Sequence, residues 1–175
     1  MSDERVFIGL GGNVGEPLRQ IGLGLAALDD DPGVSVVRVS RMYESPPWGI
    51  TDQPSFINAV AELRSSLSPS ALLRCMRGIE ESQGRQRELK WGPRTLDLDL
   101  LAFGGRISDE VGLTIPHPRI AERAFVLVPW AEIAPEFQVP GLASVAELLK
   151  DCADAAGVEP LSQDEACTEK TAANR

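Results

Sequence analysis

Two aspartates, Asp97 and Asp99, interrupt the leucine-rich segment "TLDLDLLAF" (residues 95–103) at a spacing of two. Strands usually avoid aspartate, and residues two apart in a strand point to the same face, about 6.5–7 Å from each other. Two neighbouring negative charges are unfavourable unless a cation lies between them. Hard ions such as Mg²⁺ bind carboxylates, keep several waters and complete their shell with phosphate oxygens. The pair predicts a magnesium site; a solvent-facing strand with ordinary charges is the alternative.

A cluster of basic residues lies just before the aspartates. Arg85, Arg87, Lys90 and Arg94 put four of the chain's 17 Lys and Arg into ten residues, where about one is expected by proportion. In a chain of net charge −9, this patch indicates a small anionic ligand, with a solvated loop as the alternative. Arginine suits phosphate, so a metal–polyphosphate site is predicted. The segment "GLGGNVGEP" lacks the Gly-Lys-Ser/Thr ending of a Walker A motif.

His117, the only histidine, stands between two prolines in "TIPHPRIAERAF". The prolines fix its backbone, which would suit a positioned ligand group, although a lone histidine is more often structural. Arg123 follows a few residues later, and either side chain could reach a phosphate.

Aromatic residues gather around a proline-rich loop, "ESPPWGITDQPSFINA". This loop combines Trp48, Phe56 and Asn58, while Trp91 adjoins the basic cluster and Phe125 follows Arg123. Flat rings with one amide predict a pocket for a planar heterocycle, stacked on its faces and recognised at its edge. Core packing is the alternative for the two phenylalanines.

The segments that must position these residues alternate between strand and helix patterns. Strands are predicted at about 4–11, 34–44, 56–64 and 95–103. One helix is predicted after Pro17, and a second after the N-cap Ser68, ending near Gly84. The order βαββαβ predicts an α+β, ferredoxin-like split βαβ core: an antiparallel sheet with its helices packed on one face.

The C-terminal part of the chain predicts smaller elements. We expect a short hairpin past Gly104, a short helix near 119–123, an apolar run at 125–134 and a last helix near 143–151. Residues 158–175 carry almost no large apolar side chains and are expected to be a disordered tail. A single domain is therefore predicted over residues 1–157.

Composition excludes several classes of protein. The net charge of −9 argues against nucleic-acid or anionic-membrane binding. No apolar run reaches the roughly 18 residues of a membrane span, and the N-terminus lacks the pattern of a secretory signal. The cysteines are too few and scattered for a disulfide framework or a zinc site, so a reducing cytoplasm is the expected location.

Five motifs together resemble the 6-hydroxymethyl-7,8-dihydropterin pyrophosphokinase family of the folate pathway. They are "GGN…GEP", "YESPPWG…DQPSFINAV", "GR.R", "WGPRTLDLDLLAFG" and "TIPHP…RAFVLVP", and the resemblance covers about residues 5–137. It implies a monomeric ferredoxin-like fold, two Mg²⁺ ions, and transfer of pyrophosphate from ATP to the pterin hydroxymethyl group with release of AMP. Gly12 stands where serine is common in the family, and Glu88 and Lys90 depart from its more basic run.

The resemblance also implies a role for each matching residue. Asp97 and Asp99 would hold both magnesium ions and act in catalysis with Arg85 and Arg94. The ATP-binding residues would be Arg85, Arg87, Arg94, Leu100, Thr114, His117 and Arg123. The pterin pocket would be lined by Ser45, Pro46, Trp48, Phe56, Asn58, Trp91 and Phe125. The loops at about 44–54 and 84–92 are expected to be lids that exclude water.

Two other functions would fit parts of this pattern. A nucleotide-sensing module on the same fold would bind without turnover and predicts a basic pocket without paired carboxylates. A structural protein would leave its acidic strand in solvent and predicts no convergence of the tryptophans and arginines. Asp97 and Asp99 count against the first alternative, and a pocket that gathers the aromatic and basic residues would count against the second.

Overall fold

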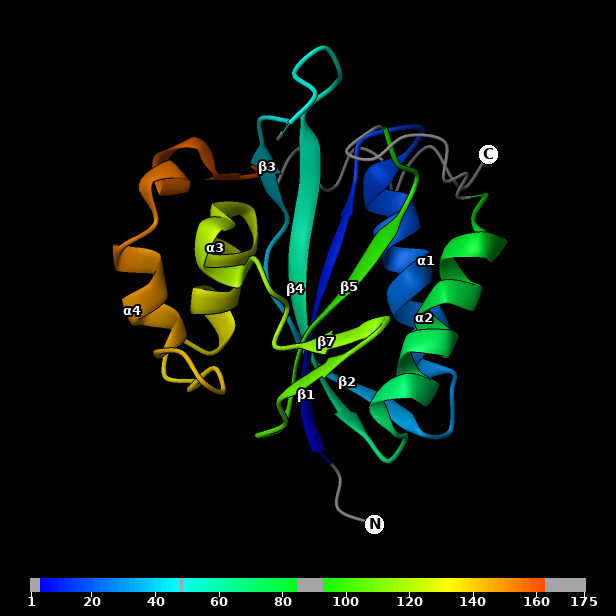
Figure 1. The fold of residues 1–175 in the computed structure, drawn as a ribbon. Helices are drawn as coiled ribbons and strands as arrows, with labels where there is room; N and C mark the ends of the chain where they lie inside the picture. Colours follow the sequence, from blue (N-terminus) through cyan, green and yellow to red (C-terminus); the bar gives the residue numbers. More distant parts are fainter. Residues whose placement is uncertain (1–3, 48, 85–92, 163–175) are drawn as a thin grey trace.

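A six-stranded antiparallel sheet runs through the middle of the protein (Figure 1). The computed structural model describes residues 4–47, 49–84 and 93–162. The strands are β1 (Glu4–Gly12), β2 (Val34–Val39), β3 (Tyr43–Ser45), β4 (Phe56–Ser65), β5 (Asp97–Phe103) and β8 (Glu159–Pro160). Their order is β5-β1-β4-β3-β8, and β2 also pairs with β4.

Helices α1 (Pro17–Asp29) and α2 (Pro69–Ser82) cover one face of the sheet (Figure 1). The Ser68 side chain accepts a hydrogen bond from the Ala71 N–H at 3.2 Å and so caps α2, whose first turn begins with proline. Gly84 follows the last turn of α2 with φ +77°, a conformation that favours glycine. The predicted ferredoxin-like core is therefore confirmed in its order, its antiparallel pairing and its two helices.

The other face of the sheet carries a second apolar core under α3 (Ala124–Ile133) and α4 (Val145–Lys150). The Phe7 ring packs against the Trp130 and Phe137 rings, with centroids 5.1 and 4.6 Å away. The apolar run predicted at 125–134 forms α3, with Pro129 inside it. The two crossover helices therefore share one face, as predicted, and the additional C-terminal helices cover the face that they leave open.

The segment predicted as one strand at 34–44 divides into β2 and β3. Its pairing with β4 shifts register between Val36 and Arg38 and continues to Val39, and after a break at residues 40–42 it resumes at Tyr43. The predicted hairpin forms from β6 (Ser108–Glu110) and β7 (Leu113–Ile115), and the predicted short helix is η1 (Ile120–Glu122). A further short helix, η2 (Ala153–Gly157), precedes β8.

The start of the predicted tail is ordered against the sheet. In β8, Glu159 pairs with Glu44 and Pro160 with Tyr43, and the Leu161 N–H donates to the Met42 carbonyl oxygen at 2.9 Å. The expected disorder is therefore wrong for residues 158–162, because backbone pairing with β3 holds a segment that has few apolar side chains. Residues 163–175 lie outside the part of the chain that the structure describes. None of the helices described combines the length and the hydropathy that crossing a bilayer requires.

Candidate active site

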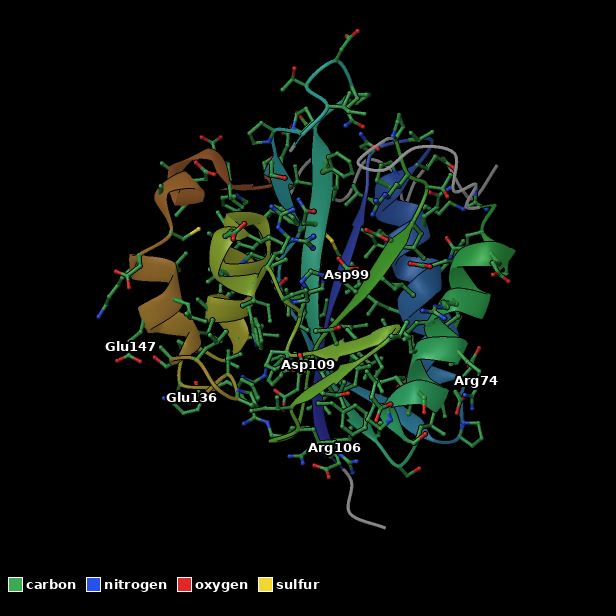
Figure 2. The ribbon with its side chains drawn as sticks, in the orientation of Figure 1. Arg74, Asp99, Arg106, Asp109, Glu136 and Glu147 are labelled. Atoms are coloured by element: carbon green, nitrogen blue, oxygen red, sulfur yellow. The ribbon has the colours of Figure 1, made fainter. Side chains whose placement is uncertain are left out.

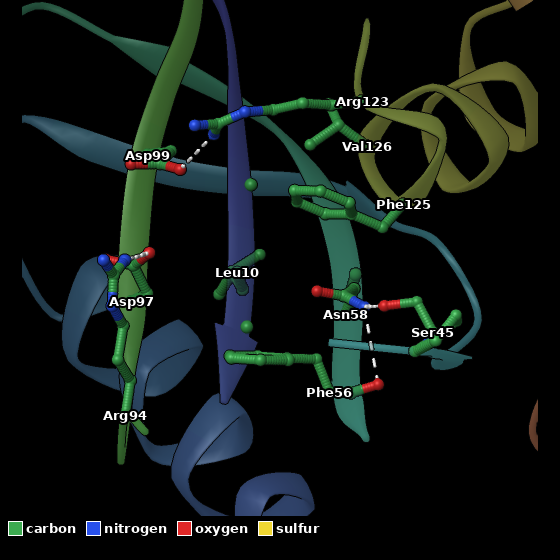
Figure 3. Close-up of a pocket in the computed structure, with 14 residues that line it drawn as sticks. Leu10, Ser45, Phe56, Asn58, Arg94, Asp97, Asp99, Arg123, Phe125 and Val126 are labelled. Carbon is green, nitrogen blue, oxygen red and sulfur yellow. Dashed lines mark hydrogen bonds and ion pairs between the residues drawn. The ribbon is translucent and has the colours of Figure 1, made fainter. Parts of the chain in front are cut away.

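A pocket opens between the sheet and the start of α3, and it gathers most of the described residues that the sequence singled out (Figure 3). Its walls come from β1, β3, β4, β5 and the segment that leads into α3. The predicted residues that line it are Ser45, Pro46, Phe56, Asn58, Arg94, Asp97, Asp99, Arg123 and Phe125. Gly9, Leu10, Gly11, Ala59 and Val126 complete the lining and were not predicted.

Asp97 and Asp99 share one face of β5 and both line the pocket, as their spacing predicts. Leu98 between them is buried in the core under α1 and α2. Across the ladder, Asp97 pairs with Gly11 and Asp99 with Gly9 on the neighbouring strand β1. In Figure 2, Asp99 lies near the middle of the view, whereas Glu136, Glu147 and Arg74 lie toward its edges.

Two arginines neutralise the like charges of the aspartates. The Arg94 guanidinium donates to Asp97, and Arg123 Nη1 lies 3.1 Å from Asp99 Oδ2. Arg123 is only 8% exposed and lies over the Phe125 ring, 5.7 Å from its centroid. Its Nε is buried and has no hydrogen-bond partner among the residues described. The arrangement explains how two neighbouring carboxylates are tolerated.

The floor between the aspartates and the far wall of the pocket is bare backbone. Gly11 pairs with Asp97 on one side and with Asn58 of β4 on the other. Gly9 likewise lies between Asp99 and Val60. Because neither glycine has a side chain, the two sides of the pocket remain open to each other across the central strand.

The far wall carries the aromatic and amide groups that were predicted for a heterocycle. The rings of Phe56 and Phe125 both point into the pocket and are half-buried (Figure 3). Asn58 is buried at the base of this wall, and its amide nitrogen donates to Ser45 Oγ at 2.8 Å. Aromatic faces beside one fixed amide are suited to a flat, polar-edged ring.

Two supporting residues were missed by sequence reasoning. Glu80 of α2 is 3% exposed, and its Oε1 accepts a hydrogen bond at 2.7 Å from the N–H of Leu98, between the two aspartates. Asn13 is buried; its Oδ1 accepts from the Arg94 N–H at 2.9 Å, and its Nδ2 donates to Gln53 Oε1 and to the Pro54 carbonyl oxygen, each at 3.0 Å. The helical periodicity could have indicated Glu80, because it follows Leu72 and Met76 at the same four-residue spacing on the buried face of α2.

His117 lies beside β5 without lining the pocket. Its backbone N–H donates to the Leu101 carbonyl oxygen at 2.9 Å, and its Nδ1 accepts from the Arg119 N–H at 3.3 Å. Burial and the positive charges of Arg123 and Arg119 lower the pKa of His117 to about 4, against the opposing charge of Asp97. The ring is therefore neutral at pH 7 and carries its proton on Nε2, as a hydrogen-bond donor.

Several predicted residues are not brought into the pocket. Leu100 lies on the opposite face of β5, buried in the core under α1 and α2, because residues at odd spacing from the aspartates alternate to the other face. Thr114 is exposed on β7. Arg85, Arg87, Trp48 and Trp91 lie outside the described residues, as does most of the loop at 84–92.

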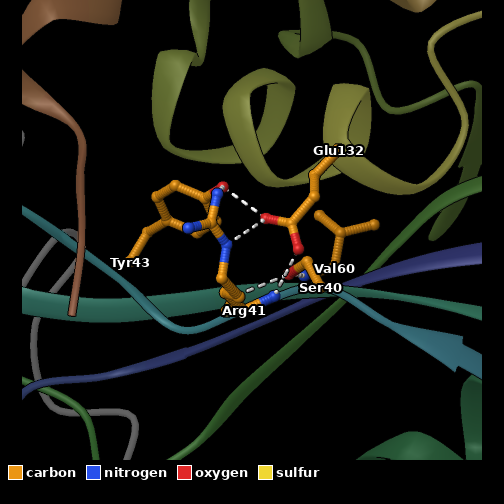
Figure 4. Close-up of polar contacts among 5 residues, drawn as sticks. All are labelled: Ser40, Arg41, Tyr43, Val60 and Glu132. Carbon is orange, nitrogen blue, oxygen red and sulfur yellow. Dashed lines mark hydrogen bonds and ion pairs between the residues drawn. The ribbon is translucent and has the colours of Figure 1, made fainter. Parts of the chain in front are cut away.

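A polar network fixes α3 to β3 next to the pocket (Figure 4). The Tyr43 hydroxyl and the backbone and side chain of Arg41 all donate to the Glu132 carboxylate. Burial raises the pKa of Glu132, but these hydrogen bonds outweigh it and the pKa is lowered overall. Burial and the hydrogen bond to Glu132 raise the pKa of Tyr43. At neutral pH Glu132 therefore stays ionised and Tyr43 stays protonated. Their hydrogen bond ties β3 to α3 at the edge of the pocket.

The donor set suits a magnesium ion that shares its shell with phosphate. Among the residues described, no three carboxylate, histidine or cysteine side chains form a ready-made metal cluster. Mg²⁺ usually takes one or two carboxylates and completes its octahedron with waters and substrate phosphates. Asp97 and Asp99, on one open face and beside arginines, whose guanidinium groups suit phosphate oxygens, fit that pattern.

Comparison with known proteins gives a consistent result. The family described as 7,8-dihydro-6-hydroxymethylpterin-pyrophosphokinase (HPPK) matches residues 7–135. A Pseudomonas aeruginosa protein named 2-amino-4-hydroxy-6-hydroxymethyldihydropteridine pyrophosphokinase is 46% identical over 149 residues, which are 85% of this chain and 92% of that protein. A protein of the same name from Haemophilus influenzae is 42% identical over 148 residues, with the same two coverages of 85% and 92%.

Solved structures resemble the chain in fold. A Plasmodium falciparum HPPK-DHPS triple mutant with SDX-DHP has a TM-score of 0.70 at 12% identity and is matched over 90% of this chain. The wild-type protein with STZ-DHP gives a TM-score of 0.66 at 13% identity over 85% of this chain. The chain spans less than half of those longer chains, 48% and 43%. At this identity the likeness concerns the fold alone.

Proposed function

The chain belongs to the 7,8-dihydro-6-hydroxymethylpterin-pyrophosphokinase family, and from that premise we infer its reaction. It transfers pyrophosphate from ATP to the hydroxymethyl group of 6-hydroxymethyl-7,8-dihydropterin, which is an enzymatic step of folate synthesis. The observation that carries this function is the pocket itself. One pocket holds a carboxylate–arginine side and an aromatic–amide side, separated only by the glycine floor of β1. Such a pocket suits an acceptor heterocycle and a polyphosphate donor that must meet.

We propose that Asp97 and Asp99 hold two Mg²⁺ ions together with the ATP phosphates. Bound there, the metal would neutralise charge on the transferred group and lower the pKa of the acceptor hydroxyl. Arg94 and Arg123 lie beside the aspartates and would turn from these carboxylates to the phosphate oxygens of the bound nucleotide. His117 would add a neutral N–H donor. The resemblance adds Arg85, Arg87, Leu100 and Thr114 to the proposed nucleotide site.

We propose that the pterin ring lies between Phe56 and Phe125, with its polar edge toward Asn58. Ser45, Pro46, Trp48 and Trp91 complete the proposed pocket. The ring's hydroxymethyl group would then reach across the glycine floor toward the aspartates. Catalysis would rest on placing the hydroxyl in line with the β-phosphorus and on stabilising charge, so that no covalent intermediate is needed.

We further propose a cytoplasmic, monomeric enzyme. Cys75 and Cys152 are free thiols in the structure, which suits a reducing compartment. The monomeric state is taken from the family resemblance and is tested by the mass of the protein in solution, where a dimer would contradict it.

Identification of the nucleotide product tests the function most directly. Incubation with Mg·ATP and the hydroxymethyl pterin should yield AMP and the pterin diphosphate in equal amounts, as measured by chromatography. Accumulation of ADP with phosphorylated pterin would indicate an ordinary kinase acting at the γ-phosphorus. Binding of ATP without any product would instead favour a nucleotide-sensing module.

A further inference from the structure

Glu80 is buried at a place where a carboxylate is energetically unfavourable. It is 3% exposed and lies on the buried face of α2, four residues after Met76. It also lies in the last turn of this helix, which ends at Ser82, where the helix dipole disfavours a negative charge. Burial of a polar or charged group costs free energy unless the group is hydrogen-bonded. A side chain that is unfavourable in both respects indicates a specific partner.

One such partner of Glu80 is the backbone of β5. Glu80 Oε1 accepts a hydrogen bond from the Leu98 N–H at 2.7 Å, and this bond is buried. The N–H belongs to the planar peptide group that joins Asp97 to Leu98, so it lies between the two residues that carry the carboxylates. The bond therefore fixes the orientation of the backbone from which Asp97 and Asp99 project.

Strand β5 receives little side-chain support from its neighbouring strand. It is the first strand in the order β5-β1-β4-β3-β8, and among the strands described it pairs with β1 alone. Opposite Asp97 and Asp99, β1 has Gly11 and Gly9, which supply no side chain for cross-strand packing. The backbone at the aspartates is therefore held by pairing with β1 on one side and by Glu80 of α2 on the other.

On the basis of the proposed function, we propose that Glu80 is a positioning residue for the metal ions held by Asp97 and Asp99. By binding the Leu98 N–H, its carboxylate keeps the peptide between the aspartates from turning, so that both carboxylates stay on the same open face. Glu80 is not among the described residues that line the pocket, so it acts through the strand and does not touch the ion. Removal of groups that orient metal ligands typically weakens metal binding about 10–100-fold.

The test measures the affinity of the site for Mn²⁺, a paramagnetic substitute for Mg²⁺, in the presence of the non-reacting analogue α,β-methylene-ATP. Electron paramagnetic resonance reports the free Mn²⁺. Glu80→Met keeps the length of the side chain but offers only a weak acceptor, so it should weaken Mn²⁺ binding about tenfold. Glu80→Gln keeps an acceptor oxygen at the same position and should bind Mn²⁺ nearly as tightly as wild type.

Glu62→Met is a matched control, because Glu62 is also a buried glutamate, at 4% exposure, and its Oε1 accepts from Arg5 Nε at 2.7 Å outside the pocket. This control should melt at a lower temperature with an unchanged affinity for Mn²⁺. A second readout is the dissociation constant of 6-hydroxymethylpterin without metal or nucleotide. It should be the same in Glu80→Met and wild type, because the aromatic wall lies away from β5.

Two results would overturn the proposal: an unchanged affinity for Mn²⁺ in folded Glu80→Met, or a loss in Glu80→Gln as large as in Glu80→Met. If Glu80→Met fails to fold, Glu80→Asp, which is one methylene shorter, takes its place and should show a smaller loss of affinity; no loss there would also overturn the proposal. Asp99→Asn is measured alongside. Weaker Mn²⁺ binding in Asp99→Asn but not in the Glu80 variants defeats this inference alone, whereas unchanged binding in Asp99→Asn defeats the proposed metal site itself.

Discussion

On β5, a single carboxylate, that of Asp99, can both stabilise the fold and bind a metal ion. Asp99 compensates the charge of Arg123, which is almost fully buried, so the aspartate is stabilising as well as available to a metal. Like-charge repulsion with Asp97 alone would predict that removing one carboxylate stabilises the fold. The arginine partners reverse that expectation, because a buried guanidinium would be left without its counter-charge.

Replacement of Asp99 by asparagine should therefore lower both activity and stability. We expect turnover to fall at least about 100-fold, because a neutral amide is a poor magnesium ligand. The free energy of unfolding should fall by about 1 kcal/mol, since Arg123 keeps a hydrogen bond but loses the charge. Steady-state kinetics and urea unfolding measure the two effects. The control is Asp109→Asn on the exposed hairpin strand β6, which should change neither turnover nor the free energy of unfolding. Near-normal turnover of Asp99→Asn at low Mg²⁺ would contradict the metal site.

His117 makes the free energy of unfolding depend on pH. Its pKa is about 4 in the folded state and 6.5 at its ordinary value, so the folded state binds the proton more weakly. The stability that the neutral ring contributes is complete above pH 6.5 and is lost as the pH falls toward 4. His117 is the only histidine, so titration in this window is readily assigned.

In His117→Gln, the fall in unfolding free energy between pH 7.5 and pH 5 should be smaller than in wild type, by about 1 kcal/mol after solvent screening is allowed for. Urea unfolding at the two pH values provides the measurement. An identical pH dependence in both proteins would show that the pKa of His117 is the same in the folded and unfolded states.

The sequence revealed site residues when their own local pattern was unusual. Asp97 and Asp99 stood out because aspartate is rare in an apolar strand. Asn13 did not, because its partners, Arg94 and the segment at Gln53 and Pro54, are distant in the chain and come together only in the fold. The resemblance placed Leu100 and Thr114 at the nucleotide, and the pocket does not include them.

Secondary-structure elements were predictable where the hydrophobic period was clear. The strands at β1, β4 and β5 and the helices α1 and α2 follow periods of two and of about 3.6. The run at 125–134 is apolar on all sides, so its periodicity could not show that it forms α3. The break between β2 and β3 depends on register with β4, which no local pattern encodes.

Asn13 joins the end of β1 to two loops, and its replacement should loosen both. Asn13→Ala removes hydrogen bonds to the Arg94 N–H, to Gln53 and to the Pro54 carbonyl. We expect the free energy of unfolding to fall by about 1–2 kcal/mol, because partly buried hydrogen-bond partners are left unsatisfied. Turnover should fall as well, because Arg94 loses its fixed position. Gln53→Ala removes one of these links and should have a smaller effect on both; equal effects of the two variants would show that the Arg94 bond contributes little.

At the scale of the whole molecule, the C-terminal strand closes the edge of the sheet beside the pocket. A chain that ends at Gly157 loses the pairing of β8 with β3 and the Leu161 hydrogen bond. It should melt about 2–4 °C below a chain that ends at Ser162, which corresponds to about 1 kcal/mol. Its Michaelis constant for the pterin should rise, because β3 carries Ser45. Calorimetry and kinetics on the two truncated chains measure this, and equal melting temperatures would show that β8 adds no stability.

The division of the sheet into two faces also affects how the protein can evolve. Helices α1 and α2 lie on the face away from the aspartates, and each contains an exposed glycine, Gly22 and Gly78, around which a Cβ would meet nothing within 4 Å. Alanine at either position should stabilise the fold by about 0.5–1 kcal/mol without altering the pocket. Mutations on one face can thus compensate for destabilising changes on the other, which leaves the pocket free to acquire new specificities while the chain still folds.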